Sequence, residues 1–463
     1  MENTIEIVEK KQHLVCEINK MVIYAQAKVV ECKNIDNNEL YYLFFYKNQF
    51  LTGRKATRVK LGGFIETAWK QGILLDASNP LLQILFSTDQ TFTLISFKKL
   101  LEKLEQQSTP QEIALIFSFF SDYLTKDSLE KVIERQYFHY RRSGQLLYAF
   151  QILQIAKHFT SSKWATHTAN QMEYQKYEKR YIQSQESLLT LDPIYVELDC
   201  YRDHLPDSSF QLLSSYYIKE KRMIDLLALS INHFSKEPTI SKYHTLTHYL
   251  HKHCNETTYL ETLMLLNKQH ETFLPLKQEI IVLLLDRKDY HNVINLLVDQ
   301  SIPLESHQKT KLKAWLTSQD VLPQVMKVEK ANMVLLTLFK SEPQELEHIL
   351  SECVTELLKE HNIKYVNNWL SPLNQEQISL PILNKVEKMA MIQDDPDKQF
   401  LLGEYYYDLH LYEQAIECFS WEMELNSTDP QPVRWLSRLY NELGMTNESK
   451  DYQQVFLSMQ KHA

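Results

Sequence analysis

The chain has 463 residues, a formal net charge of −9 and a pI near 6.0. This balance gives no electrostatic basis for non-specific DNA or RNA binding, so no specific nucleic acid is expected as a partner. Only 7 residues are glycine, against an average usage of about 7%. That scarcity argues against glycine-dependent hairpins and against Rossmann and P-loop enzymes, and it favours an all-helical chain.

Cysteine usage and the apolar runs set the expected compartment. The six cysteines are scattered and form no CxxC pair, which is typical of reduced, mostly buried thiols. The first residues, MENTIEIVEKKQ, are charged and do not resemble a secretory signal. Apolar runs such as 41–46 and 280–285 are far shorter than the roughly 18 residues of a membrane span. The expected location is therefore cytoplasmic, without a membrane span.

Residues 1–107 show apolar positions at helical spacing, among them Val15, Ile18 and Met21, and they predict a mostly helical N-terminal region. The segment 91–97 has a strand-like composition and fits that prediction least. Residues 47–64 hold five basic residues and three of the seven glycines. They do not form a P-loop motif, and they predict a solvated loop, with a basic contact patch as the alternative.

From residue 108 the pattern becomes one of repeated helix pairs. Thr109 and Glu112 flank Pro110 as a capping box. Patterns of two helices joined by a polar turn follow at 140–156, 214–231 and 283–297. Prolines recur about where such helix pairs would begin. The region 300–395 is helical by pattern, but its repeat register stays open.

The clearest helix pair lies at 396–430. Small residues at Gly403 and Ala415 permit close approach of two helices, and the large side chains of Tyr406 and Phe419 fill the space beside them. A shift of 34 positions places a weaker copy at 430–463, with Ser437 at the position of Gly403. Each helix pair alone leaves one face uncovered, so copies are expected to stack.

This pattern resembles the tetratricopeptide repeat (TPR) family, although Gln399, Glu422, Ser427 and Gln453 depart from it. The resemblance implies an all-α fold, a right-handed α-solenoid of TPR-like hairpins with a non-repeat N-terminal region. The predicted domains are 1–107, the degenerate repeats 108–395 and the C-terminal pair 396–463.

The same resemblance implies a binding groove lined by the first helix of each repeat. Carried over residue by residue, the predicted protein-binding positions are Phe400, Glu404, Tyr407, Asp408, Arg434, Arg438 and Asn441. Arg434 and Arg438 lie one helical turn apart, a spacing suited to a carboxylate.

A histidine cluster offers a different chemistry. His244, His248 and His251 fall on one helix face, close to His253 and Cys254. Histidines one turn apart can bind a metal, but three turns of one helix cannot surround a tetrahedral ion. A partly exposed histidine face is the preferred interpretation, and no resident metal or cofactor is expected.

Three functional hypotheses follow. The first is an intracellular scaffold, without catalysis, that binds a protein segment or peptide through the concave face. The second is a peptide-responsive regulator whose N-terminal region is the effector. The third is a metal-dependent enzyme that uses the face of His244, His248 and His251. The sequence does not identify the partner.

Overall fold

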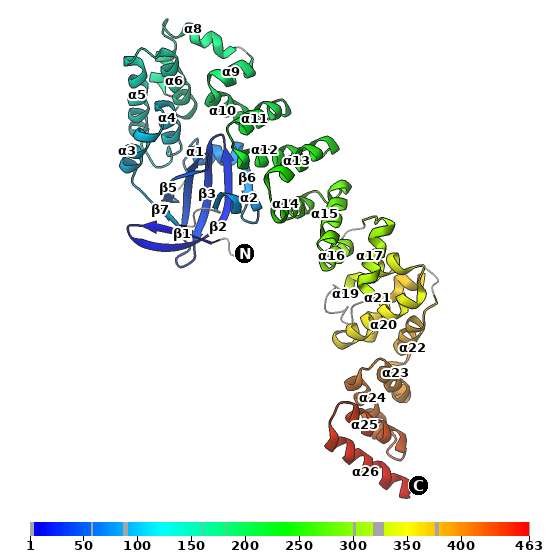
Figure 1. Ribbon diagram of the computed structural model, residues 1–463. Helices are drawn as coiled ribbons and strands as arrows, with labels where there is room; N and C mark the ends of the chain where they lie inside the picture. The colour runs from blue at the N-terminus through cyan, green and yellow to red at the C-terminus, as the bar shows by residue number, and fades with distance from the viewer. Residues whose placement is uncertain are drawn as a thin grey trace. The chain divides into compact units, whose positions relative to one another are not determined.

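The structure, a computed structural model, describes residues 4–56, 59–86, 91–160, 162–182, 184–299, 302–317, 328–375 and 379–462 (Figure 1). The chain divides into two compact units, Met1–Leu276 and Lys277–Ala463.

The first unit contains a seven-stranded β-sheet, so the prediction of an all-α fold with a mostly helical N-terminal region is wrong. The strands are β1 (Thr4–Glu9), β2 (Gln12–Tyr24), β3 (Ala27–Asn34), β4 (Leu40–Tyr46), β5 (Gln49–Lys55), β6 (Ile73–Asp76) and β7 (Thr91–Thr93). The basic segment 47–64, expected to be a solvated loop, thus includes β5; its Arg58 lies outside the described residues.

The sheet is mixed and follows the order β5-β4-β3-β2-β1-β7, with β6 also paired to β2. Among the described strands, only β1 and β7 are parallel neighbours. The 13-residue β2 pairs with β1 through Gln12–Glu17 and with β6 through Lys20–Ile23, so two strands share one of its edges. An irregularity between Ile18 and Lys20 in the pairing with β3 separates the two stretches, as expected of a bulge that bends a strand.

The sheet curls until β5 approaches the chain just after β7. Thr52 bridges the gap: its Oγ1 donates to the Ile95 carbonyl at 2.9 Å and accepts from the Ile95 amide at 3.0 Å. One face is filled by a cluster of aromatic rings, in which Phe45 contacts Phe50, Phe86 and Phe92 at centroid distances of 5.4–6.0 Å. The Thr52 side chain therefore links β5 to the chain after β7, although β5 and β7 are not paired in the described sheet.

The glycine argument failed because other residues occupy the left-handed turn positions of the sheet. Lys10 and Lys11 join β1 to β2 at φ of 50° and 71°, and Ala25, Asn38 and Lys47 take φ between 48° and 60° in later turns. Such conformations are costly for residues with a Cβ but are tolerated as single positions. Scarce glycine therefore does not exclude a sheet.

The first unit also contains helices, some of which pack on the sheet. They are α1 (Phe64–Gln71), α2 (Pro80–Phe86), α3 (Phe97–Gln107), α4 (Pro110–Ser118), α5 (Lys126–Arg142), α6 (Leu146–Thr160), α7 (Lys163–Ala169), α8 (Gln175–Glu178), α9 (Gln185–Leu191), α10 (Pro193–Arg202), α11 (Asp207–Lys219), α12 (Met223–Lys236), α13 (Ile240–His253) and α14 (Glu256–Gln269), with a 3-10 turn at Lys179–Ile182 and α15 (Leu274–Asp286) crossing the boundary. The predicted capping box is present, since Thr109 and Glu112 each bond the other's backbone amide.

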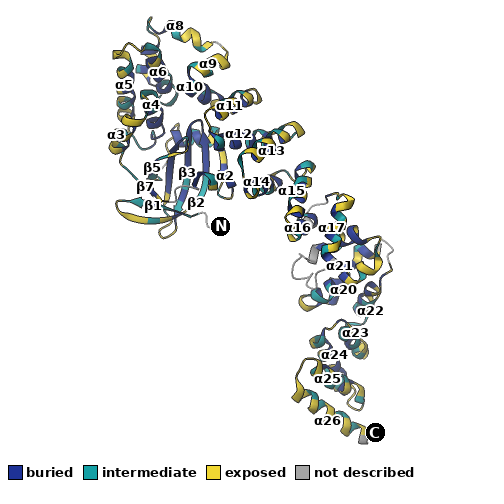
Figure 2. Cartoon of the chain, viewed as in Figure 1, coloured by how far each residue is buried: buried dark blue, intermediate teal, exposed yellow. Residues whose placement is uncertain are grey.

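Both faces of the sheet are covered, and Figure 2 shows the central strands as buried. Phe44 packs on Phe120, with centroids 4.9 Å apart, whereas the next residue, Phe45, belongs to the aromatic cluster on the other face. Gly72, at the end of α1, lies so close to β2 that a Cβ there would be 2.6 Å from the Ile23 carbonyl oxygen. Because both faces are buried, β4 shows no alternation of apolar and polar residues.

The described part of the second unit is helical. Its elements after α15 are α16 (Tyr290–Asp299), α17 (Ser306–Thr317), α19 (Val328–Phe339), α20 (Pro343–Glu360), α21 (Ile363–Gln375), α22 (Pro381–Ile392), a 3-10 turn (Pro396–Lys398), α23 (Gln399–Asp408), α24 (Tyr412–Leu425), α25 (Pro430–Glu442) and α26 (Thr446–His462). In the parts of the chain that the structure describes, no helix is long and apolar enough to span a membrane.

The C-terminal helices form two hairpins with the packing that their sequence predicts. The buried ring of Phe419 would lie 2.9 Å from a Cβ at Gly403, so α23 and α24 approach closely only because that residue is glycine. At the equivalent positions of α25 and α26, Ser437 and Ser449 each donate to the other's carbonyl oxygen, at 2.9 and 2.8 Å. Small residues thus hold both helix pairs, by contact in one and by paired hydrogen bonds in the other.

Candidate functional site

The predicted binding residues lie on α23 and α25, which meet through their side chains. The ring of Tyr407 on α23 contacts Trp435 on α25 edge-on, at a centroid distance of 4.9 Å. The guanidinium of Arg438 lies 4.7 Å from the Tyr407 ring and 5.3 Å from the Trp435 ring. We call the surface made by Tyr407, Arg434, Trp435 and Arg438 the α23/α25 face.

The rings of Tyr407 and Trp435 orient Arg438, and the described contacts show no such ring beside Arg434. Arg434 and Arg438 are both exposed, and among the described residues neither forms an ion pair with a carboxylate. Glu442, which follows Arg438 by four positions on α25, accepts a long hydrogen bond of 3.4 Å from the Tyr407 hydroxyl. Desolvation raises the pKa of Tyr407, against the opposing effect of Arg438, so the ring stays a neutral platform for the cation at neutral pH.

The other predicted binding positions do not belong to the α23/α25 face. Phe400 packs inward on Phe419, with centroids 5.3 Å apart, and therefore belongs to the core of its hairpin. Asp408 pairs with Lys385 of α22 at 3.1 Å. Glu404 is half-buried and Asn441 is exposed. The sequence reasoning missed Trp435, whose position directly after Arg434 gave no signal of its contact with another hairpin.

The histidine face on α13 does not assemble a metal site. His251 stacks on Tyr259 of α14 at 4.1 Å, while His244 and His248 line a shallow surface hollow. Burial raises the pKa of the Cys254 thiol to about 11, which disfavours the thiolate that metals bind. Among the described residues, no group of three or more His, Cys, Asp or Glu side chains is placed to hold a metal ion. The metal-enzyme hypothesis gains no support from this geometry.

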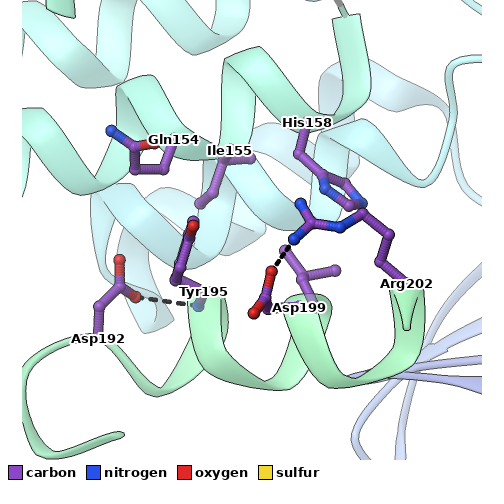
Figure 3. Close-up of a pocket in the computed structure, with 8 residues that line it drawn as sticks. Gln154, Ile155, His158, Asp192, Tyr195, Asp199 and Arg202 are labelled. Carbon is purple, nitrogen blue, oxygen red and sulfur yellow. Dashed lines mark hydrogen bonds and ion pairs between the residues drawn. The ribbon is translucent and has the colours of Figure 1, made fainter. Parts of the chain in front are cut away.

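A small pocket between α6 and α10 gathers polar side chains (Figure 3). Its volume of about 10 Å³ leaves room for about one water molecule. The buried Asp192 caps α10 by accepting from the Tyr195 amide at 3.2 Å, and it also accepts from Tyr181 at 2.6 Å and Gln111 at 2.9 Å. Burial raises the pKa of Asp192, although the three hydrogen bonds act in the opposite direction and lower it. Its hydrogen bonds tie α10 to α4.

His158 in the same pocket is not poised for proton transfer near neutral pH. Its Nε2 lies 3.1 Å from the Tyr24 hydroxyl, which also donates to Gln71 at 3.2 Å. Burial, helped by Arg202, lowers the pKa of His158 to about 4. Figure 3 shows Arg202 turned toward Asp199, its ion-pair partner. A general acid or base works best with a pKa near the working pH, so a structural role fits this group better.

The most deeply buried charges join the sheet to the helices. Lys28 of β3 has no exposed side-chain surface and bonds both carboxylate oxygens of Asp225 at 3.0 and 2.8 Å. Arg222 bonds Asp225 at 3.0 Å and Glu197 at 2.8 Å, and Tyr217 donates to Glu197 at 2.8 Å. Burial alone would raise the pKa of Asp225, but Arg222 and Lys28 hold it below its usual value.

This network also fixes two turns at one end of the sheet. Arg222 donates to the Ala25 carbonyl at 3.0 Å, in the turn between β2 and β3. Lys28 donates to the Lys47 carbonyl at 2.7 Å, in the turn between β4 and β5. Two cations and two carboxylates are matched, and each cation also anchors a backbone carbonyl. We call Lys28, Glu197, Arg222 and Asp225 the buried charge network.

Comparison with known proteins adds little to this geometry. No protein-family model matches the chain, and no curated protein matches it. A solved structure described as Naa15/Naa10 bound to HypK-THB contains a chain with 12% sequence identity and a TM-score of 0.19. The match covers 78% of this chain and 60% of that one. A TM-score this low supports no conclusion about the fold or the function.

Proposed function

We propose that the protein is a non-enzymatic scaffold that binds an acidic segment of another protein through the α23/α25 face. The observation that supports the proposal is the pair of exposed arginines, Arg434 and Arg438, which have no carboxylate partner among the described residues. One helical turn separates them, so together they present two guanidinium groups to an incoming chain.

The aromatic rings prepare Arg438 for this role. Its stacking on Tyr407 and Trp435 limits the conformations of the side chain before any partner arrives. An arginine that is already oriented loses less entropy when it bonds a carboxylate. Tyrosine, tryptophan and arginine are also the residues that most often dominate the energy of protein interfaces.

Charge complementarity selects the partner. Asp408 is already paired with Lys385, whereas Glu442 keeps its negative charge while it accepts from the neutral Tyr407 hydroxyl. The two arginines supply the positive charge of this face. Aspartate or glutamate side chains, or a chain's terminal carboxylate, would satisfy guanidinium groups through paired hydrogen bonds. A basic segment would meet uncompensated positive charge.

Affinity capture with the full chain and a charge-reversed variant tests the proposal. Arg434→Glu combined with Arg438→Glu should lose proteins that the unaltered chain retains. Lys388→Glu combined with Lys450→Glu changes the net charge equally at other exposed positions, and it should retain them. If the arginine variant captures the same proteins as the unaltered chain, the α23/α25 face is not the binding surface.

A further inference from the structure

A second cavity lies in the first unit, where one end of the sheet meets the helices. Its volume is about 500 Å³, within the roughly 300–1,000 Å³ typical of small-molecule sites. Gln26, Tyr46 and Lys47 line it from the sheet, the first turn of α4 and the start of α10 line it from the helices, and the last turn of α11 completes it. We call it the junction cavity.

The sheet side of the junction cavity is held rigidly. The Tyr46 hydroxyl is 2.8 Å from both Gln26 Oε1 and Glu112 Oε1. The Lys47 amide donates to the Gln26 carbonyl at 2.6 Å, and the Lys47 carbonyl accepts from Lys28 at 2.7 Å. The backbone of both lining turns is thus fixed by hydrogen bonds to the sheet and to the buried charge network.

The helical side is tied together as well. Gln111 of α4 donates to Asp192, the cap of α10, at 2.9 Å, and Glu112 closes the capping box with Thr109. A site whose supporting residues are locked by other hydrogen bonds needs little rearrangement to bind a ligand. The junction cavity is therefore preformed, unlike the pocket of Figure 3, which has room for about one water.

The charges that line the junction cavity are mixed, and the Lys47 ammonium lies 5.2 Å from the centroid of the Tyr46 ring. The ammonium groups of Lys47 and Lys219 and the carboxylate of Glu220 have no ion-pair partner among the described residues. Lys219 and Glu220 are exposed, and Lys47 is half-buried. Glu112 adds a second carboxylate, already bonded by Tyr46. Two positive and two negative groups around one hollow favour a ligand that carries both signs of charge over a simple anion or cation.

We propose that the junction cavity binds one small zwitterionic molecule of the amino-acid or dipeptide class. Lys47 and Lys219 would hold its carboxylate, and Glu220 together with Glu112 would face its ammonium group. The apolar parts of the lining, Leu189, Pro193 and Ile194, provide a surface for an uncharged side chain. This site is separate from the α23/α25 face and does not depend on the proposed scaffold function.

Isothermal titration of the intact chain tests the proposal with defined probes. The free amino acids and alanyl-alanine are the zwitterions, N-acetyl-alanyl-alanine keeps only the anion, and alanyl-alanine amide keeps only the cation. At least one zwitterion should bind with a stoichiometry of one, and its singly charged analogues should bind about tenfold more weakly or worse, a loss of about 1.4 kcal/mol.

Variants then locate the binding. Ser215→Trp places a large side chain at an exposed position that lines the cavity and should abolish binding, and Lys219→Met should weaken it. Lys252→Met removes an exposed charge from α13 and should leave it unchanged. The proposal is overturned if no zwitterion binds at millimolar concentration, if the analogues bind equally well, or if binding survives Ser215→Trp in a folded protein.

Discussion

Two arginine clusters in this chain show how burial decides what the same side chain does. Arg222 in the first unit has a side chain that is 3% exposed, and it bonds two carboxylates while lying 4.5 Å from the ring of Tyr217. Arg438 in the second unit also lies over aromatic rings, but it is exposed and has no carboxylate partner among the described residues. One cluster has matched charges, and the other presents unmatched ones.

This difference in burial assigns the Arg222 cluster to the stability of the fold and the Arg438 cluster to the proposed binding of a partner. Taking Arg222, Asp225 and Lys28 out of water has a large desolvation cost, so these charges persist only because each is paired. At the surface the same cost is not incurred, and an unpaired guanidinium is tolerated until a partner supplies the carboxylate. Substitutions in the two clusters should therefore affect different measurements.

The largest effect is expected from Asp225→Ala. It leaves Lys28 and Arg222 buried without their shared carboxylate, and breaking a buried pair typically costs about 3–5 kcal/mol. Chemical denaturation followed by tryptophan fluorescence, to which Trp69 and Trp164 of the first unit contribute, should show this loss of unfolding free energy. Lys70→Ala, which removes a surface pair with Glu66, is the control and should change stability little. Equal effects of the two would mean that the network is not the anchor of the sheet.

A pH effect of similar size is expected at His158. Its pKa falls from 6.5 to about 4 in the folded chain, so the unfolded chain binds the proton first on acidification. This contribution is present in full above pH 6.5 and is lost as the pH falls toward 4, by roughly 3 kcal/mol in total. His158→Gln should lose less stability than the unaltered chain between pH 7 and pH 4.5. An identical pH dependence would show that the pKa of His158 does not differ between the folded and the unfolded chain.

A smaller effect is expected in the C-terminal hairpin. Gly403→Ala places a Cβ 2.9 Å from the buried ring of Phe419, and overpacking of this kind costs about 1–3 kcal/mol. Thermal unfolding should show the loss. Combining it with Phe419→Leu relieves the clash, so Gly403→Ala should add nothing in that background. Strictly additive effects would contradict the close contact of α23 and α24.

Local features of the fold were predictable from the sequence. The capping box of Thr109 and Glu112 and the close packing at Gly403 depend on residues near one another in the chain, and the structure contains both. The sheet was not predictable in the same way. Val15, Ile18 and Met21 fit a helical spacing, yet Val15 is 47% exposed on β2 while the other two are buried.

The candidate sites were also predictable only where they depend on residues that are close in the sequence. Arg434 and Arg438 could be found because they are one turn apart on one helix. The partner rings of Arg438 come from two helix pairs, and the contact between Tyr407 and Trp435 leaves no local pattern. Lys28 and Asp225 are 197 residues apart, so only the folded chain reveals their pairing. The junction cavity depends on these distant contacts and had no signal in the sequence.

The most direct test of the central claim measures an acidic peptide on the α23/α25 face. A fluorescent peptide of alternating glutamate and leucine, and its lysine–leucine counterpart, are titrated against the full chain by anisotropy. We predict that only the acidic peptide binds, and that Arg434→Glu with Arg438→Glu weakens it at least about tenfold, while Lys388→Glu with Lys450→Glu does not. Equal binding of both peptides, or binding unchanged by the arginine substitutions, would contradict the account.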